Sequence, residues 1–228
     1  MESEIDFLKR SIDAQIQKYI ASNIKTAILF EACEHALYGG KRIRACIPLS
    51  MILAIDQCKT RKNGFPSKHD YLAASSIEYL HAASLIIDDL PCMDNDCLRR
   101  DRQTVHFKYG ERIAQLASTT LVSLAIASLA EAVEILPQKI GLFIIKYVCE
   151  RMGSQGASGG ELREFDTNGS DINVEEIINM KTSTFFEISL MIGWLFSGGD
   201  VEHISEISTA AKYNTKGSPA IKAVPNAL

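Results

Sequence analysis

Hydrophobic residues recur along most of the chain at the spacing of one face of an α-helix. In the first such stretch the apolar face contains Ile5, Leu8, Ile12, Ile16 and Ile20. Further helices are expected over 29–37, from the basic segment near 41 to 55, and over 71–90, 140–152, 174–196 and 201–213. The segment 104–135 is expected to form either one long helix or a broken pair. No segment alternates like two strands joined by a tight turn. The pattern therefore predicts an all-α fold.

Glycine, proline and polar residues mark the expected helix ends. Gly39 and Gly40 can end the second helix with a left-handed cap. Asp70 is a plausible N-cap for the helix over 71–90, and Pro91 ends that helix. From Asn214 the hydrophobic pattern stops. We therefore predict one domain over 1–213 and an irregular tail over 214–228.

Composition limits the classes of function that the chain can have. It has 228 residues, 46% of them hydrophobic, and a net charge of -4, which gives no general attraction to nucleic acid or to an anionic membrane. The longest apolar run, Leu121 to Val133, is too short to span a bilayer and contains Glu131. Six cysteines without a CxxC pair indicate reduced thiols. A cytoplasmic protein without a membrane span is expected.

Charged residues of both signs crowd into the segment from Asp88 to Arg102, DDLPCMDNDCLRRDR. Carboxylates gathered without apolar spacers suit hard cations such as Mg²⁺, and neighbouring guanidinium groups bind phosphate oxygens in a fork. The alternative is a solvated loop whose charges pair with one another. Its position directly after an apolar helix favours the cation and phosphate interpretation.

Two further groups could act with this acidic segment. His81 precedes Asp88 by two helical turns, about 10 Å along the axis, although a single histidine in an apolar helix is often a satisfied core residue. The segment GGKRIR places Lys41, Arg42 and Arg44 at the start of a helix, where backbone N–H groups also favour anions. A surface basic cluster is the alternative for this segment.

Taken together, the motifs resemble those of the trans-type prenyl diphosphate synthases, which include the farnesyl and geranylgeranyl diphosphate synthases. GGKRIR, HAASLIIDDLPCMDNDCLRR, TVH, SGGE and KTSTFFEIS occur in the family's order, and the resemblance covers roughly 29–213. It implies an isoprenoid-synthase-type helical bundle around a central apolar cavity, Mg²⁺ as cofactor, and a homodimer. Its implied substrates are isopentenyl diphosphate and an allylic diphosphate.

The resemblance also implies roles for individual residues. The first aspartate-rich motif, which binds Mg²⁺, corresponds to Asp88, Asp89 and Asp94. The contacts to the allylic diphosphate correspond to Arg99 and Lys181. The pocket for isopentenyl diphosphate corresponds to Lys41, Arg44, His81 and Arg100. The residues near the reacting carbons correspond to Thr182 and Glu161, the latter in place of the family's glutamine.

The implied reaction accounts for these residue types. Breaking an allylic C–O bond leaves a carbocation and a diphosphate anion, whose developing charge is stabilised by cations placed in advance. The double bond of the second substrate then attacks the cation, and a proton is lost. No protein nucleophile is needed, and the sequence contains no serine or cysteine triad pattern.

The resemblance assigns product length to the position five residues before the first aspartate, where a bulky side chain stops elongation. Here that residue is Ala83, followed by Ser84. Small side chains favour a C20 product, geranylgeranyl diphosphate, over the C15 farnesyl product. On this basis Ala83→Tyr is predicted to shorten the product.

The sequence departs from the family at its end. The family's second motif, FQxxDDxxD, is absent, and no acidic residue follows Ala210. We therefore expect a C-terminally truncated chain, without the last helices of the family and with impaired activity. One alternative is a catalytically silent partner subunit of a full-length synthase. Another is a structural helical bundle with a solvated acidic loop.

Overall fold

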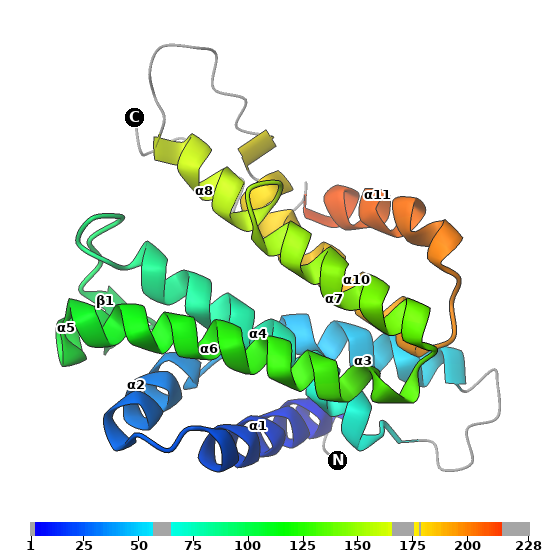
Figure 1. Ribbon diagram of the computed structural model, residues 1–228, viewed down its shortest axis with the longest axis horizontal. Helices are drawn as coiled ribbons and strands as arrows, with labels where there is room; N and C mark the ends of the chain where they lie inside the picture. The colour runs from blue at the N-terminus through cyan, green and yellow to red at the C-terminus, as the bar shows by residue number, and fades with distance from the viewer. Residues whose placement is uncertain (1–2, 57–64, 166–175, 178, 216–228) are drawn as a thin grey trace. The chain divides into compact units, whose positions relative to one another are not determined.

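The computed structural model describes residues 3–56, 65–165, 176–177 and 179–215. The helices and strands in chain order are α1 (Glu4–Asn23), α2 (Ala27–Leu37), α3 (Ile43–Asp56), α4 (Lys68–Asp88), β1 (Leu98–Arg99), β2 (Arg102–Gln103), α5 (Val105–Tyr109), α6 (Glu111–Ala132), the 3-10 turn η1 (Val133–Ile135), α7 (Gln138–Met152), α8 (Ala157–Phe165), the π-helical turn η2 (Asn179–Ser183), α10 (Thr184–Phe196), the 3-10 turn η3 (Val201–His203) and α11 (Ile204–Thr215). The predicted all-α fold is confirmed (Figure 1).

The chain divides into two compact units. Unit 1 comprises Met1–Leu49 and Phe65–Ile135, and unit 2 comprises Ser50–Gly64 and Leu136–Leu228, so the boundary falls within α3. Of the predicted tail, only Asn214 and Thr215 belong to a described element, α11. The rest of the tail lies outside the described residues.

Unit 1 is built on α4 and α6, which pack along each other, with α1, α2 and α5 against them (Figure 1). Small residues allow the close approach of α4 and α6. The buried Ser118 hydroxyl donates to the Ala83 carbonyl at 2.9 Å, and the Ser128 hydroxyl donates to the Leu72 carbonyl at 2.9 Å. Full burial of large side chains, such as Leu8 on α1, stabilises the unit by about 1.5–3 kcal/mol each.

Unit 2 contains a buried carboxylate that the sequence did not reveal. Glu187 on α10 is 2% exposed and pairs with Arg151 of α7, whose Nη2 lies 2.9 Å from its Oε1. The Tyr147 hydroxyl donates to the same carboxylate, and burial together with the nearby Glu187 raises the pKa of Tyr147 to about 12. These contacts join α7 to α10.

The predicted start of α4 was wrong. Ser67, not Asp70, is the N-cap of α4: the Ser67 hydroxyl accepts from the Asp70 backbone, and the Asp70 carboxylate accepts from the Ser67 backbone. This reciprocal capping box makes Asp70 the third helical residue. Of the two alternatives predicted over 104–135, the broken pair is observed: α5 and α6 are separated at Gly110, whose φ of 85° is left-handed. The described part of the segment predicted over 174–196 is helical: 176–177 are α-helical, η2 is a π-helical turn, and α10 begins at Thr184.

The prediction of no strand pair was also wrong. β1 and β2 pair antiparallel, with Arg99 opposite Arg102. The turn residues Arg100 and Asp101 have φ of 53° and 61°, as a type I′ hairpin requires at both central positions. Strands of two residues are too short to show alternation in a sequence.

The apolar helix α6 begins well before the apolar run that starts at Leu121. Within the described residues, the segment Glu111–Ile135 alone meets the length and hydropathy expected of a membrane span, and 44% of its most apolar window is buried. The length argument made from Leu121 to Val133 therefore does not hold for this helix. Its buried face packs on α4, so the core of unit 1 accounts for part of its apolar character.

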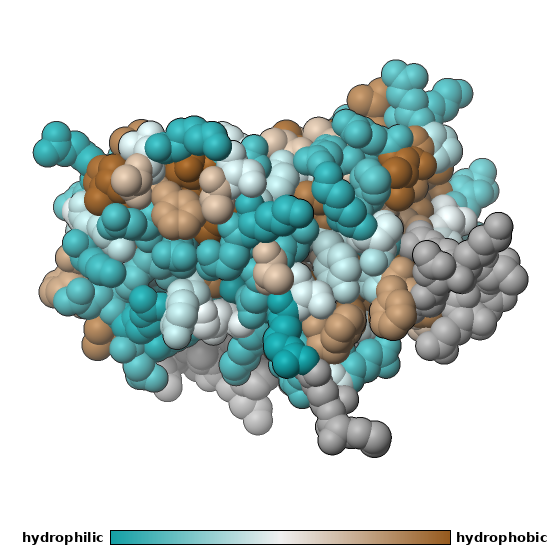
Figure 2. All heavy atoms as spheres, turned by 90° about the horizontal axis from the view of Figure 1, so that it is seen from below, coloured by the Kyte–Doolittle hydropathy of each residue, from teal (hydrophilic) through white to brown (hydrophobic). Residues whose placement is uncertain are grey.

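The face drawn in Figure 2 is mainly hydrophilic, with hydrophobic residues in separate patches. Among the exposed hydrophobic residues of α1 and α2 are Ile5, Phe7 and Ile28. Scattered residues of this kind are usual on protein surfaces and require no partner.

Arg42 joins three parts of unit 1. It is 7% exposed, and its Nε donates to Asp13 of α1 at 2.7 Å. Its Nη1 donates to Glu78 of α4 at 3.2 Å, and its Nη2 donates to the carbonyl of Leu37 at the end of α2 at 2.5 Å. Glu78 also accepts from the Ala45 backbone at 3.3 Å. We call Arg42, Asp13 and Glu78 the Arg42 cluster.

Replacing Arg42 by methionine is expected to lower the free energy of unfolding by about 3–5 kcal/mol, because it leaves Glu78 buried without its counter-charge. Urea unfolding followed by circular dichroism measures the change. The double variant Arg42→Met with Glu78→Leu should recover part of the loss, since an apolar pair replaces the buried ions. Arg112→Met, at an exposed position of α6, is the control. A loss for Arg42→Met equal to that of the control would contradict a stabilising role.

Candidate functional site

The three basic residues of the segment from Gly39 to Arg44 line one cavity, and Arg42 among them is buried. Gly39 and Arg42 have left-handed φ of 69° and 54°. A Cβ on Gly40 would lie 2.4 Å from Arg42 Nη1, so any other residue at this position would force the buried guanidinium to shift. Lys41 and Arg44 line the cavity together with His81 and Arg100.

This cavity has a volume of about 470 Å³ and lies within unit 1. Its lining comprises Gly39, Lys41, Arg42, Ile43, Arg44, Glu78, His81 and Arg100. Glu78 is the one carboxylate in that lining, and it is bonded to Arg42. Cationic groups thus outnumber carboxylates around the cavity, which favours an anion. All four residues that the sequence analysis associated with isopentenyl diphosphate line this one cavity.

His81 is a neutral hydrogen-bonding group in this cavity. Arg44 Nη1 lies 3.2 Å from His81 Nε2, and because arginine only donates, Nε2 accepts and the ring proton is on Nδ1. Burial, reinforced by the positive charges of Arg44 and Arg100, holds the pKa of His81 well below 6.5. Burial likewise lowers the pKa of Arg44.

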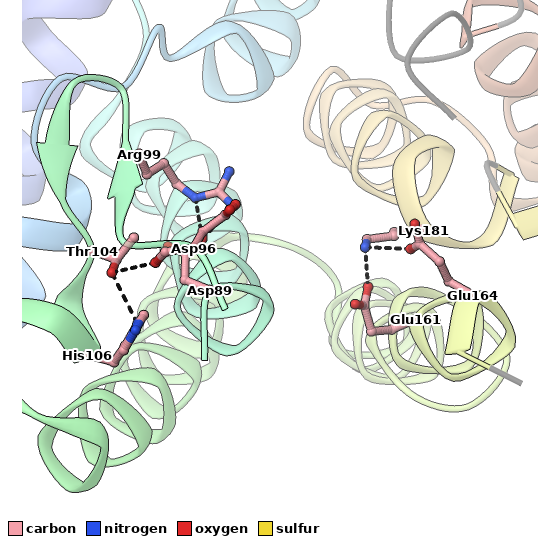
Figure 3. Close-up of polar contacts among 8 residues, drawn as sticks. All are labelled: Asp89, Asp96, Arg99, Thr104, His106, Glu161, Glu164 and Lys181. Carbon is pink, nitrogen blue, oxygen red and sulfur yellow. Dashed lines mark hydrogen bonds and ion pairs between the residues drawn. The ribbon is translucent and has the colours of Figure 1, made fainter. Parts of the chain in front are cut away.

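The acidic end of α4 is held by an arginine of the hairpin. Asp89 caps α4 and is 4% exposed. Its Oδ1 lies 2.5 Å from Arg99 Nη2 and 2.7 Å from Arg99 Nε (Figure 3). The Asp94 backbone N–H donates to the Asp88 carbonyl at 2.9 Å, which folds the loop back onto the helix end.

Thr104 and His106 stabilise the loop that follows α4 through hydrogen bonds near Asp96. The Thr104 hydroxyl donates to the Asp96 carbonyl at 2.8 Å and lies 3.1 Å from His106 Nδ1 (Figure 3). Because the hydroxyl proton is used on Asp96, His106 donates to Thr104. No specific role was predicted for these residues, although TVH was among the motifs of the resemblance.

The donor chemistry of Asp88 and Asp89 suits Mg²⁺, but the described residues contain no group of three His, Cys, Asp or Glu side chains arranged to hold a metal. The structure therefore does not gather Asp88, Asp89 and Asp94 into a three-carboxylate cluster. Mg²⁺ commonly uses one or two protein carboxylates and completes its shell with water and substrate phosphates. The two adjacent carboxylates fit that mode of binding.

A second polar cluster lies in unit 2. Lys181, on the π-helical turn η2, has its Nζ 2.5 Å from Glu161 Oε2 and 2.7 Å from Glu164 Oε2, both on α8 (Figure 3). Thr182 follows on the same turn and is half-buried. The glutamate in place of the family's glutamine is thus paired with the lysine that was predicted to bind diphosphate.

Ala83 and Ser84, the predicted product-length residues, differ in exposure. Ala83 is 1% exposed within unit 1. Ser84 is half-buried, and its hydroxyl donates to the His81 carbonyl of its own helix at 3.0 Å. A large side chain is therefore accommodated more readily at Ser84 than at Ala83.

The polyprenyl synthetase family profile matches residues 26–215. The chain belongs to this family. Geranylgeranyl pyrophosphate synthase 4 of Arabidopsis thaliana is 31% identical over 218 residues, which cover 93% of this chain and 55% of that protein. Farnesyl diphosphate synthase of Geobacillus stearothermophilus is also 31% identical over 218 residues, which cover 93% of this chain and 71% of that protein.

Solved structures of the family have the same fold. The geranyltransferase of Legionella pneumophila matches with a TM-score of 0.77 and 26% identity over 91% of this chain and 73% of that one. An isoprenoid synthase family member of Thermotoga neapolitana matches with a TM-score of 0.73. The predicted family and its all-α isoprenoid-synthase fold are confirmed. The chain spans 55% and 59% of two plant relatives that it matches.

The lowered pKa of His81 predicts a pH dependence of stability. The unfolded chain binds a proton at this histidine below about pH 6.5, whereas the folded chain does not, so the free energy of unfolding falls as the pH decreases through this range. The contribution of one such histidine is at most about 1.4 kcal/mol per pH unit. Chemical unfolding at pH values from about 7.5 to about 5, the range in which histidine titrates, measures this contribution.

His81→Gln should flatten that dependence, because the variant lacks the titrating ring. His203→Gln, at a position where the side chain is 54% exposed, should keep the wild-type slope. Identical slopes for the wild type and His81→Gln would show that the folded ring titrates as it does in the unfolded chain.

Proposed function

We propose that the chain is a prenyltransferase that joins isopentenyl diphosphate to an allylic diphosphate. The observation that carries the proposal is the cavity lined by Lys41, Arg44, His81 and Arg100. A diphosphate has many acceptor oxygens and several negative charges, which match guanidinium and ammonium donors. Membership of the polyprenyl synthetase family supports the same chemistry.

In this proposal the cationic cavity binds isopentenyl diphosphate. Arg44 and Arg100 supply charge, and the neutral His81 lines the cavity without adding a further positive charge. The Arg42 cluster, whose charges are paired internally, fixes the backbone from which Lys41 and Arg44 project. The binding site is thereby organised before the ligand arrives, which lowers the entropy lost on binding.

In unit 1 we assign Arg99 to the allylic diphosphate, with Asp88 and Asp89 as the carboxylates that would hold a divalent cation, Mg²⁺ in our proposal, and Asp94 as a further candidate. For Lys181 of unit 2, the resemblance to the family supports a contact with diphosphate. When bound, the cation stabilises negative charge on the departing diphosphate. The protein contributes by fixing Asp89 through Arg99 and by holding the loop through Thr104. Thr182 and Glu161 are assigned to the neighbourhood of the reacting carbons.

Turnover of radiolabelled isopentenyl diphosphate with geranyl or farnesyl diphosphate and Mg²⁺ tests the activity. We expect a longer prenyl diphosphate to form, and Arg44→Met to lower kcat/KM for isopentenyl diphosphate by about 10–100-fold, the worth of a charge-assisted hydrogen bond. Lys146→Met, 77% exposed on α7, is the control that should keep wild-type values. Equal kcat/KM for Arg44→Met and wild type would refute the assignment of this cavity.

A second candidate function is a silent subunit that alters the product of a complete synthase, because the 228-residue sequence contains one DDxxxxD segment and no DDxxD segment. The same assay separates the two. Product formed by the chain alone favours the enzyme. No product alone, but a changed product distribution on addition to a full-length synthase, favours the silent subunit.

For product length we propose C20 over C15, since Ala83 and Ser84 are both small. Ser84→Phe is expected to shift the product toward C15, because the larger side chain occupies space available to the growing prenyl tail. Mass spectrometry of the products measures the ratio. Ser123→Phe, an exposed serine of α6 whose hydroxyl bonds only within its own helix, is the matched control. The same ratio in both variants would contradict the role of Ser84.

A further inference from the structure

Lys181 is already neutralised by two carboxylates of α8. The ammonium Nζ lies 2.5 Å from Glu161 and 2.7 Å from Glu164. The Glu161 side chain is 13% exposed and that of Glu164 is 43% exposed. Since water screens the more exposed pair, the contact with Glu161 is the stronger of the two.

The backbone fixes Glu161 in this position. A Cβ on the preceding residue, Gly160, would lie 2.7 Å from the backbone nitrogen of Lys181 and 2.8 Å from Met180 Cβ. Glycine therefore lets α8 and η2 approach within backbone contact, which places the next side chain of α8 beside Lys181. Met180 O also accepts from the Thr184 hydroxyl at 2.7 Å, which ties the turn to α10. Glu161 has little freedom to withdraw from the ammonium.

The second oxygen of Glu161 gives an independent reason to regard the carboxylate as a poor fit for its surroundings. Oε1 is buried and has no hydrogen-bond partner among the described residues. A buried carboxylate oxygen without a donor is costly. The ion pair with Lys181 compensates the negative charge of Glu161. If a ligand drew the Lys181 ammonium away, this carboxylate would remain largely buried without a counter-charge.

We propose that Glu161 is an internal competitor that occupies Lys181 when no ligand is bound and so sets the affinity of this cluster for diphosphate. The inference rests on the proposed function, because it takes a diphosphate as the ligand of Lys181. A diphosphate oxygen and the Glu161 carboxylate compete for the same ammonium. The anion must displace Glu161 or bind beside it against its negative charge.

Calorimetric titration with inorganic pyrophosphate in the absence of metal tests this competition. Every protein in the series, including the reference called wild type here, carries Arg44→Met, which weakens anion binding at the cavity of unit 1 so that the titration reports the Lys181 cluster. Glu161→Gln keeps the size of the side chain and removes its charge, and we expect it to tighten pyrophosphate binding about tenfold, as loss of one charge-assisted competitor predicts. Glu164→Gln should have a smaller effect because its side chain is more exposed. Glu150→Gln, 50% exposed on α7 and paired with Lys146, is the control and should change nothing.

A double-mutant cycle ties the effect to Lys181. In a Lys181→Met background, Glu161→Gln should give a much smaller gain than in the wild-type background, because the ammonium for which the two anions compete is gone. Circular dichroism of each variant checks that the helices are retained. An equal gain in pyrophosphate affinity in both backgrounds would contradict the competition, because it would show that Glu161 acts through its charge and not through Lys181.

The failure of this inference is distinguishable from that of the proposed function. If pyrophosphate binds the wild type and Glu161→Gln with the same affinity, Glu161 is not a competitor, while the isopentenyl assignment to Lys41 and Arg44 stands. If pyrophosphate binds neither protein, both the competition and the proposed contact of Lys181 with diphosphate are contradicted.

Discussion

A buried guanidinium organises the basic segment of this chain. Arg42 has a left-handed backbone and three acceptors from α1, from the end of α2 and from α4. Since a buried charge is costly unless it is paired, the chain folds around Arg42 so that Asp13 and Glu78 meet it. Gly40 leaves the space that the guanidinium needs. Lys41 and Arg44, on either side of Arg42 in the sequence, then line the cavity.

The two units treat positive charge differently. In unit 1 the cavity lining contains Lys41, Arg44 and Arg100 with a single carboxylate, which already belongs to the Arg42 cluster. In unit 2 one lysine meets two glutamates. An anion is therefore expected to bind unit 1 readily, whereas at Lys181 it meets competition. We therefore propose that isopentenyl diphosphate binds the cationic cavity without displacing a carboxylate, whereas a diphosphate at Lys181 competes with Glu161.

The helices of this fold could be predicted because their hydrophobic faces repeat over many residues, as Leu8, Ile12 and Ile16 do on α1. Features set by a few residues could not. The hairpin depends on left-handed conformations of Arg100 and Asp101, and the start of α4 depends on reciprocal bonds between Ser67 and Asp70. Such local conformations leave no periodic signal in the sequence.

In the candidate site, too, some features could be predicted from the sequence and others could not. The resemblance to the prenyl diphosphate synthases indicated Lys41, Arg44, His81 and Arg100, and these residues line one cavity. The resemblance assigned Arg44 and not Arg42 to the pocket, but the structural role of Arg42 could not be predicted, because it depends on tertiary contacts with Asp13, Leu37 and Glu78. It registered a glutamate at position 161 but not its pairing with Lys181, which depends on the close approach of α8 and η2 at Gly160.

The central claim is that the Arg42 cluster holds Lys41 and Arg44 in position to bind a diphosphate, and the affinity of isopentenyl diphosphate for the Gly40→Ala variant tests it most directly. The added methyl group would displace the Arg42 guanidinium, yet Gly40 is not part of the cavity lining. Titration calorimetry should show binding to the wild type and at least about tenfold weaker binding to the variant, the loss of one charge-assisted contact. An unchanged dissociation constant in a folded variant would contradict the claim.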